Sequence, residues 1–259
     1  MNTSLTLHFV RQDLVDKHAS SALGWLWTLL LPLANILIFT LVFSQIMGAR
    51  LGAMGMEYLG AYSYSVYLIA GLLAWTTFAT TLNRTSRVFH EKGRLITKVR
   101  VSLFALPLYI LISESIIYLV SMTFYAIFLW LVDFQWPITW LWLPLIFVLQ
   151  QVFAYGLGLL LAIFSVFFRD IKNLVGIIIQ LWFWLTPIVY VIDILPEKWH
   201  SVLAFNPMYH SITAFRDTLI FGRHPDLTSL LVLAGLGSGI LALALFTGRH
   251  LEKDIRDFL

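Results

Sequence analysis

Residue types that carry out enzyme chemistry occur in this sequence, but their spacing forms no catalytic or metal-binding motif. No G-x-x-x-x-G-K-S/T run is present, so the chain holds no phosphate loop for binding ATP. The seven histidines include no H-E-x-x-H pair or other close pair suited to a metal ion. There is no cysteine, which excludes disulfides and thiolate chemistry. We therefore expect no catalytic residue, metal site or cofactor on this chain.

Acidic residues are scattered along the chain, mostly beside basic residues at the ends of apolar runs. Two carboxylates facing each other in a cleft would support glycosyl chemistry. The best acids for such a membrane-embedded glycan-modifying enzyme are Asp193 and Glu197, which also suit ordinary residues at a membrane interface. This enzyme class stays open as the alternative to a non-catalytic protein.

Glu114 is the one charged residue inside a long apolar run, 102–132. An ionisable side chain at membrane depth is costly and often functional. The other reading is that Glu114 is protonated, or bonded to Ser113, Ser115 or a neighbouring helix. The sequence leaves both readings open.

The composition is that of a membrane protein. Of 259 residues, 59% are hydrophobic and only 12% are charged, whereas a soluble domain carries about 25% charged residues. Long runs almost free of charge can each hold a helix of about 20 residues, and they are too long for strands. We expect an all-α, polytopic, single-domain protein with about six transmembrane helices. The predicted spans are 25–47, 60–82, 103–132, 142–168, 173–192 and 227–248.

The basic residues orient these spans. If the N-terminus is cytoplasmic, thirteen lysines and arginines fall on the cytoplasmic side and four on the other side. The excess of positive charge marks the cytoplasmic face. We therefore expect both termini to be cytoplasmic.

Three segments between the spans have distinct patterns. Residues 4–20 alternate apolar and charged positions as an amphipathic helix on the inner membrane surface does. The loop 84–101 is the most basic stretch of the chain. Segment 193–226 is too apolar for a solvated loop and too interrupted by proline for a span. Short helices that re-enter the outer leaflet are expected there, provided that protein covers their backbone.

Three sequence blocks occur in order on this pattern. The first runs from Leu23-Gly24-Trp25-Leu26-Trp27 to Pro32. The second joins Phe168-Arg169-Asp170-Ile171-Lys172-Asn173 to Leu185-Thr186-Pro187-Ile188-Val189-Tyr190. The third joins Phe205-Asn206-Pro207-Met208 to Phe215-Arg216-Asp217. In order and spacing, the chain resembles the ABC-2-type permeases that export bacterial polysaccharides such as O-antigen, capsule and teichoic acid.

This resemblance implies a homodimer in the bacterial inner membrane, paired with two cytoplasmic ABC ATPase subunits. The ATPase subunits would bind ATP and Mg²⁺, and their hydrolysis would drive a lipid-linked polysaccharide across the membrane. It implies no nucleic-acid partner. An ABC-2 exporter of a small lipid or drug is the runner-up.

The resemblance also implies roles for particular residues. Helix 4–20 would lie against the ATPase, and the coupling element would be centred on Glu91, Lys92, Gly93 and Arg94, although membrane topology alone explains much of that basic charge. The family often has an aromatic-proline pair after the lysine of this loop, whereas Val99-Arg100 follows Lys98 here. Arg169 and Asp170 would either form a local ion pair or make a second ATPase contact.

The external segment resembles the paired gate helices of the family, with Asn206 and Pro207 in the turn between them because proline lacks an amide donor. Aromatic rings pack on the apolar faces of sugars. The predicted polymer-path residues are Trp25, Phe39, Phe43, Trp182, Trp184 and Tyr190.

Overall fold

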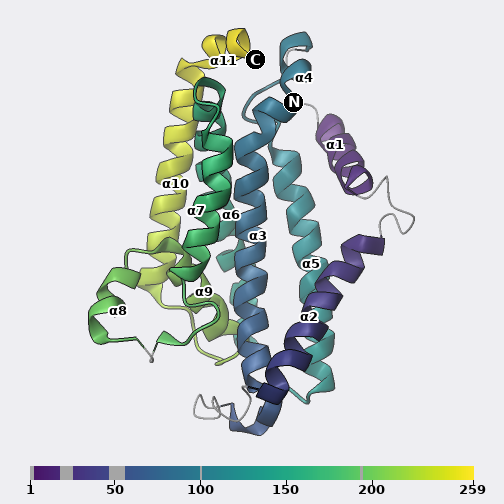
Figure 1. Cartoon of the computed structure of the whole chain (residues 1–259), viewed down its shortest axis with the longest axis vertical. Coiled ribbons are helices and arrows are strands. Elements are labelled where there is room, and N and C mark those ends of the chain that lie inside the picture. The colour runs from purple at the N-terminus through teal and green to yellow at the C-terminus, as the bar shows by residue number, and fades with distance from the viewer. Residues whose placement is uncertain (1–2, 18–25, 47–55, 100, 193–194) are drawn as a thin grey trace.

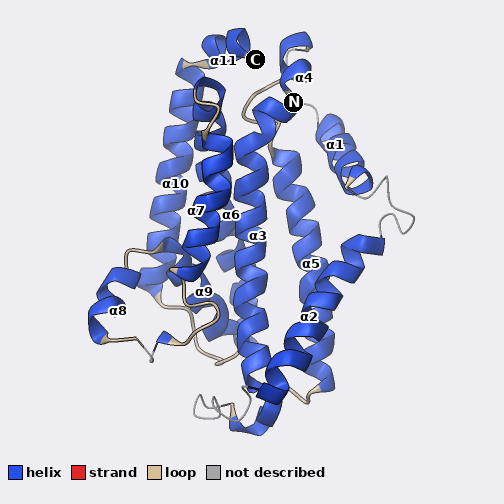
Figure 2. Cartoon of the chain, viewed as in Figure 1, coloured by secondary structure: helices blue, strands red, loops and turns tan. Residues whose placement is uncertain are grey.

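The computed structural model describes residues 3–17, 26–46, 56–99, 101–192 and 195–259, and it contains helices but no strand within these ranges (Figure 2). The predicted all-α class is therefore confirmed. The helices are α1 (Thr3–Asp16), α2 (Leu26–Ile46), η3 (Glu57–Tyr62), α3 (Ser63–Glu91), α4 (Gly93–Lys98), α5 (Leu108–Leu131), η4 (Ile138–Trp142), α6 (Leu143–Phe167), α7 (Ile171–Trp184), α8 (Glu197–Leu203), α9 (Pro207–Leu219), α10 (Leu227–His250) and α11 (Glu252–Phe258).

Four segments of the described chain are long and apolar enough to cross a membrane: Tyr58–Glu91, Leu108–Leu131, Ile138–Phe167 and Leu227–His250. Two shorter apolar helical segments accompany them, Leu33–Val42 within α2 and Ile171–Trp184. This pattern is that of a polytopic membrane protein. The count of six full spans remains a prediction, since two of the six are short.

The helix ends differ from the predicted spans in three places. Helix α3 continues to Glu91, nine residues past the predicted end at 82, and is about 43 Å long at 1.5 Å per residue. Helix α5 begins at Leu108 rather than at 103, because Pro107 stands at its N-cap. Helix α7 ends at Trp184 rather than at 192, two residues before Thr186, where Pro187 disfavours helix. At about 21 Å, α7 is shorter than the ~30 Å hydrocarbon core.

One end of the bundle carries α1, α4, α11 and the turn between α6 and α7 (Figure 1). We call this end the basic end, since most of the lysines and arginines of the described residues lie on these elements, beside them, or on the adjoining parts of α3, α7 and α10. Helix α6 packs along both α3 and α10. A Cβ atom at Gly156 would lie 2.9 Å from the backbone nitrogen of Leu241, so the backbones of α6 and α10 approach closely there. Such close approach at glycine is typical of helix pairs in membranes.

Helix α9 lies inside the bundle, against α3, α6 and α10. Its Ser211 donates to Gln150 Oε1, and Gln150 Nε2 donates to the carbonyl of Ala74. Gln150 is seven residues from the start of α6, about 10 Å along its axis. The α9 backbone is thus covered by protein, which is the condition that the sequence analysis set for a re-entrant segment.

Candidate functional site

A charged network joins three helices near the basic end. Glu114 of α5 is 4% exposed, and its Oε1 accepts a hydrogen bond of 2.8 Å from Lys17 Nζ, just after α1. Arg84 of α3 forms ion pairs with both Glu114 and Asp13 of α1. Two acids and two bases therefore neutralise one another, and the network fastens α1 to the ends of α3 and α5.

The structure shows which groups Glu114 bonds to. Glu114 is the seventh residue of α5, about 9 Å from the start of the helix. It bonds to neighbouring helices, which was one of the predicted options, whereas Ser115 donates within its own helix to Leu111. Glu114 thus lies within the candidate span Leu108–Leu131, nearer to its first residue than expected because α5 begins at Leu108.

The four predicted coupling residues lie together where α3 gives way to α4. Glu91 ends α3, and Gly93 begins α4 after the single residue Lys92. The Lys92 ammonium lies 5.8 Å from the centre of the Tyr109 ring. Glu91 and Lys92 line a small hollow of about 140 Å³ whose other wall comes from α1. Arg94 is exposed. The two segments that the resemblance assigned to the ATPase interface are therefore neighbours in their described parts, 4–17 and 84–99.

Arg169 and Asp170 lie in the turn between α6 and α7 and are both exposed. The ion pairs of the described residues do not include one between these two side chains, so the predicted local ion pair is not formed. The end of α3 is bonded to both sides of the turn. Arg87 Nη2 donates to the carbonyl of Lys172 (3.2 Å), and His90 Nε2 lies 2.9 Å from the carbonyl of Ser165.

An aromatic hollow lies where α7, α8 and α9 meet, away from the basic end (Figure 1). Its volume is about 610 Å³. It contains three of the predicted polymer-path residues and both residues of the predicted gate turn. Its lining residues are Trp182, Trp184, Leu185, Tyr190, Leu195, Trp199, Val202, Leu203, Phe205, Asn206 and Pro207.

Asn206 organises this hollow. Its side chain caps α9 by accepting from the amide of Met208 (3.0 Å), and Pro207 occupies the first turn of that helix. The same Oδ1 accepts a 2.8 Å hydrogen bond from Trp182 Nε1. Its amide nitrogen donates to Thr186 Oγ1 (2.9 Å). The expected turn between two short helices is present, and it is tied to the end of α7.

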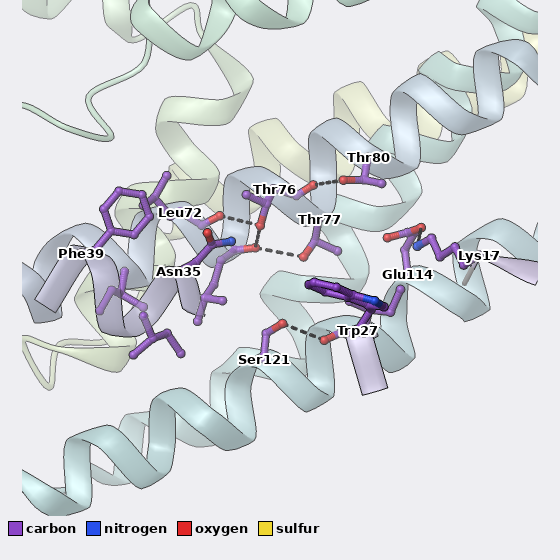
Figure 3. A pocket seen from close by; sticks show the side chains of 14 residues that line it. Lys17, Trp27, Asn35, Phe39, Leu72, Thr76, Thr77, Thr80, Glu114 and Ser121 are labelled. Atoms are coloured by element: carbon purple, nitrogen blue, oxygen red, sulfur yellow. Dashed lines mark hydrogen bonds and ion pairs between the residues drawn. The ribbon is translucent and has the colours of Figure 1, made fainter. Parts of the chain in front are cut away.

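Phe39, another predicted aromatic residue, does not line this hollow. Phe39 of α2 lines a separate pocket of about 370 Å³, between α2, α3 and α5, that ends at the Lys17–Glu114 pair (Figure 3). The wall from α3 carries Thr76, Thr77 and Thr80, whose hydroxyls donate back to their own helix. The side chain of Phe43 and the whole of Trp25 lie outside the described residues. The described members of the predicted aromatic set are thus divided between two pockets.

Arg216 is a residue that the sequence reasoning missed, since it was counted as a loop charge on the outer side. It is 4% exposed within α9, and its guanidinium carbon lies 3.5 Å from the centre of the Tyr67 ring. It donates to Tyr67 Oη (2.7 Å) and to the carbonyls of Pro187 (2.6 Å) and Ile188 (2.7 Å). A signal was present in the sequence, because apolar residues at 212, 215 and 219 place position 216 on a buried helix face.

These contacts make Arg216 a clamp between α9, α3 and the turn after α7. Among the described residues, its partners are carbonyls, a hydroxyl and a ring face, and none of them is a carboxylate. A buried cation without a carboxylate partner must be held by several such groups at once. Arg216 therefore joins α9, α3 and the turn after α7 at the end of the bundle away from the basic end.

Comparison with known proteins matches residues 6–220 to the family model for ABC-2 type transporters. The chain is similar to the O-antigen export system permease protein RfbA of Klebsiella pneumoniae, with 28% identity over 93% of this chain and 90% of that protein. RfbA of Myxococcus xanthus is 27% identical over 96% of this chain and 93% of its own. The polysialic acid transport protein KpsM of Escherichia coli is 24% identical over 92% and 91%.

The family match covers most of the chain, and the matched region includes the charged network, the α3–α4 junction and the aromatic hollow. These relatives are named as transport or export proteins, so the chain is a transport permease rather than an enzyme. Its place is the bacterial inner membrane, and an ABC transporter works with an ATPase. The protein belongs to the ABC-2 type transporter family.

Proposed function

We propose that this chain is the transmembrane subunit of an exporter that moves a lipid-linked polysaccharide, an O-antigen or a related cell-surface polymer, across the inner membrane. Two copies of the chain form the path, and two ATPase subunits bind ATP and Mg²⁺ on the cytoplasmic side. The names of the relatives support the class of substrate, since they include both O-antigen and polysialic acid transport.

The observation that carries the proposal is the aromatic hollow beside the Asn206–Pro207 turn. Tryptophan and tyrosine rings present flat apolar faces with a polar edge, which suits the C–H faces and hydroxyls of sugars. Ring contacts tolerate different residues of a repeating polymer, as a conduit requires. Trp184, Trp199 and Phe205 are exposed in the single chain, so their rings are available to a ligand or to the second copy.

The basic end is assigned to the cytoplasm, with both termini there, because its excess of lysine and arginine follows the positive-inside rule. In this orientation α1, the α3–α4 junction and the α6–α7 turn all face the ATPase. Arg87 and His90 bond the end of α3 to both sides of that turn. A displacement of the end of α3 would therefore be transmitted to the α6–α7 turn, and the reverse.

The test is export in the protein's own cells after the chromosomal gene has been replaced by variants. Trp184→Ala and Trp199→Ala are expected to lower surface polysaccharide at least fivefold while full-length lipid-linked polymer accumulates inside. Trp130→Ala is the matched control, because Trp130 is exposed on α5 and lines no described pocket.

Accumulation of complete polymer inside is the discriminating result. A glycan-modifying enzyme would leave incomplete polymer instead. Normal surface polymer after deletion of the whole gene would contradict the proposal and would favour export of a small lipid or drug.

A further inference from the structure

The C-terminal helix α11 contacts α4, the short helix that begins at Gly93. Arg256 of α11 donates from Nη1 to the carbonyl of Ile96 (3.0 Å) and from Nη2 to the carbonyl of Val101 (2.7 Å). These two acceptors lie within α4 and just after it. One guanidinium therefore spans the end of α4 and the chain that leaves it.

Helix α4 needs such support. It has six residues, whereas isolated helices shorter than about 12–15 residues are marginal. The last four carbonyls of a helix have no partner within it, and a cation near that end interacts favourably with the helix dipole. Ile96 is among these four residues, so Arg256 satisfies a carbonyl that α4 cannot satisfy.

Packing reinforces the contact. Ile255 and Ile96 are both buried in the same apolar cluster at the basic end. The side chain of Leu259 lies 3.8 Å from where a Cβ of Gly93 would stand. Phe258 packs edge-on against Phe167 of α6, with 5.5 Å between ring centres. Helix α11 is thus anchored on α6 and holds α4 from the side.

A third contact orients the guanidinium. Glu252 lies one turn before Arg256, and its Oε1 accepts a hydrogen bond of 3.0 Å from Arg256 Nη2. The pair is partly exposed, and exposed pairs of this spacing contribute little stability. Its effect is to direct the guanidinium toward Val101, because Nη2 donates both to Glu252 and to the carbonyl of Val101.

We propose that Arg256 is a positioning residue for coupling: it holds α4 in the orientation in which an ATPase movement is transmitted to α3. The inference rests on the proposed coupling role of residues 91–94. Without Arg256, the end of α4 bonds to water and the helix moves independently of the bundle. ATP hydrolysis then continues, but less of it is converted into export.

The experiment uses the complete transporter, permease with its ATPase, in lipid vesicles or cells, and measures polymer exported per ATP hydrolysed. Arg256→Gln is expected to lower this ratio at least fivefold while the complex still assembles. Arg256→Lys keeps a cation at the end of α4 and should restore part of the ratio. Lys253→Gln is the matched control, since Lys253 is exposed on the same helix.

If Arg256→Gln yields no complex, Arg256→Lys decides the question. Its single ammonium group cannot bond to the carbonyls of Ile96 and Val101 from two separate nitrogens as the guanidinium does. A ratio in Arg256→Lys equal to that of the unchanged protein then overturns the inference. An unchanged ratio in Arg256→Gln, or an equal fall in Lys253→Gln, overturns it as well.

Arg94→Ala separates this inference from the proposed function. If Arg94→Ala lowers the ratio and Arg256→Gln does not, only the role of Arg256 is wrong. If Arg94→Ala and Arg256→Gln both leave the ratio unchanged, the coupling role of residues 91–94 falls together with the inference.

Discussion

Arg84 of α3 is paired with Glu114 of α5, and their side chains meet beneath α1 with Lys17 and Asp13 completing the network. The partners of Glu114 are 97 and 30 residues away in the sequence. A helix that the sequence placed on the membrane surface is therefore fixed to the bundle by charge as well as by Val10, its buried apolar residue.

Glu114→Gln should loosen α1 because it leaves Lys17 and Arg84 without their shared carboxylate. Breaking a buried pair costs about 3–5 kcal/mol, and the partial exposure of both cations reduces this to about 1–3 kcal/mol. We expect a lower unfolding temperature and faster proteolysis of α1 in the purified permease. Asp254→Asn, a change to an exposed acid on α11, is the control. An unchanged rate of α1 cleavage in Glu114→Gln would show that the network does not hold the helix.

Gly156→Ala should separate α6 from α10. The added methyl group would meet the backbone of Leu241 at 2.9 Å, and backbone atoms cannot move aside cheaply. Overpacking of this kind costs about 1–3 kcal/mol. Gly235→Ala on α10 is the matched control, since nothing lies within 4 Å of the new atom there. Thermal unfolding in detergent should shift downward only for Gly156→Ala, and equal shifts for both variants would contradict the close approach.

The long spans could be predicted from the sequence because hydropathy alone determines them. Helix α6 (Leu143–Phe167) and helix α10 (Leu227–His250) match the predicted 142–168 and 227–248 within two residues. The end of α7 could not be read from hydropathy, since the turn that follows Trp184 is also apolar. Only Pro187 signals the break, and the turn is held by Arg216 from a distant helix.

The candidate site was predictable in part. Trp182, Trp184 and Tyr190 were predicted as polymer-path residues from the chemistry of their rings, and Asn206 and Pro207 as the gate turn from a resemblance. The structure brings these five residues around one hollow. Phe39 could not be separated from them, because the sequence does not say which face of α2 meets which helix. The role of Arg216 was missed because its partners are main-chain carbonyls and a ring face, which no sequence motif displays.

Asn206→Ala and Trp182→Phe should be coupled in stability. Asn206→Ala removes an N-cap, worth about 0.5–2 kcal/mol, together with the 2.8 Å bond from Trp182. Trp182→Phe removes the same bond from the other side. In a double-mutant cycle, the loss of unfolding free energy in the double variant should be smaller than the sum of the two single losses by about 0.5–2 kcal/mol. Asn173 is at an exposed position of α7 and serves as the control. The effects of Asn173→Ala and Trp182→Phe on the free energy of unfolding should be additive. Strict additivity for Asn206 and Trp182 would mean that the bond contributes nothing.

Gly71→Ala should disturb the Arg216 clamp. A Cβ at position 71 would lie 2.6 Å from Arg216 Nη2, the nitrogen that donates to Ile188. The guanidinium cannot turn away without breaking its other bonds, so the cost should reach about 1–3 kcal/mol. Gly239→Ala, with nothing within 4 Å, should be neutral or slightly stabilising.

The same clash gives a sharper measurement in a second background. In Arg216→Met the flexible thioether can give way, so Gly71→Ala should cost little there although it is destabilising in the parent protein. The shift in unfolding temperature caused by Gly71→Ala is therefore measured twice, once with Arg216 present and once in Arg216→Met. The difference between the two shifts reports the contact between position 71 of α3 and Arg216 of α9. If Gly71→Ala lowered the unfolding temperature by the same amount in both backgrounds, the methyl group would be clashing with something other than the guanidinium. That result would contradict the proposed contact between position 71 and Arg216.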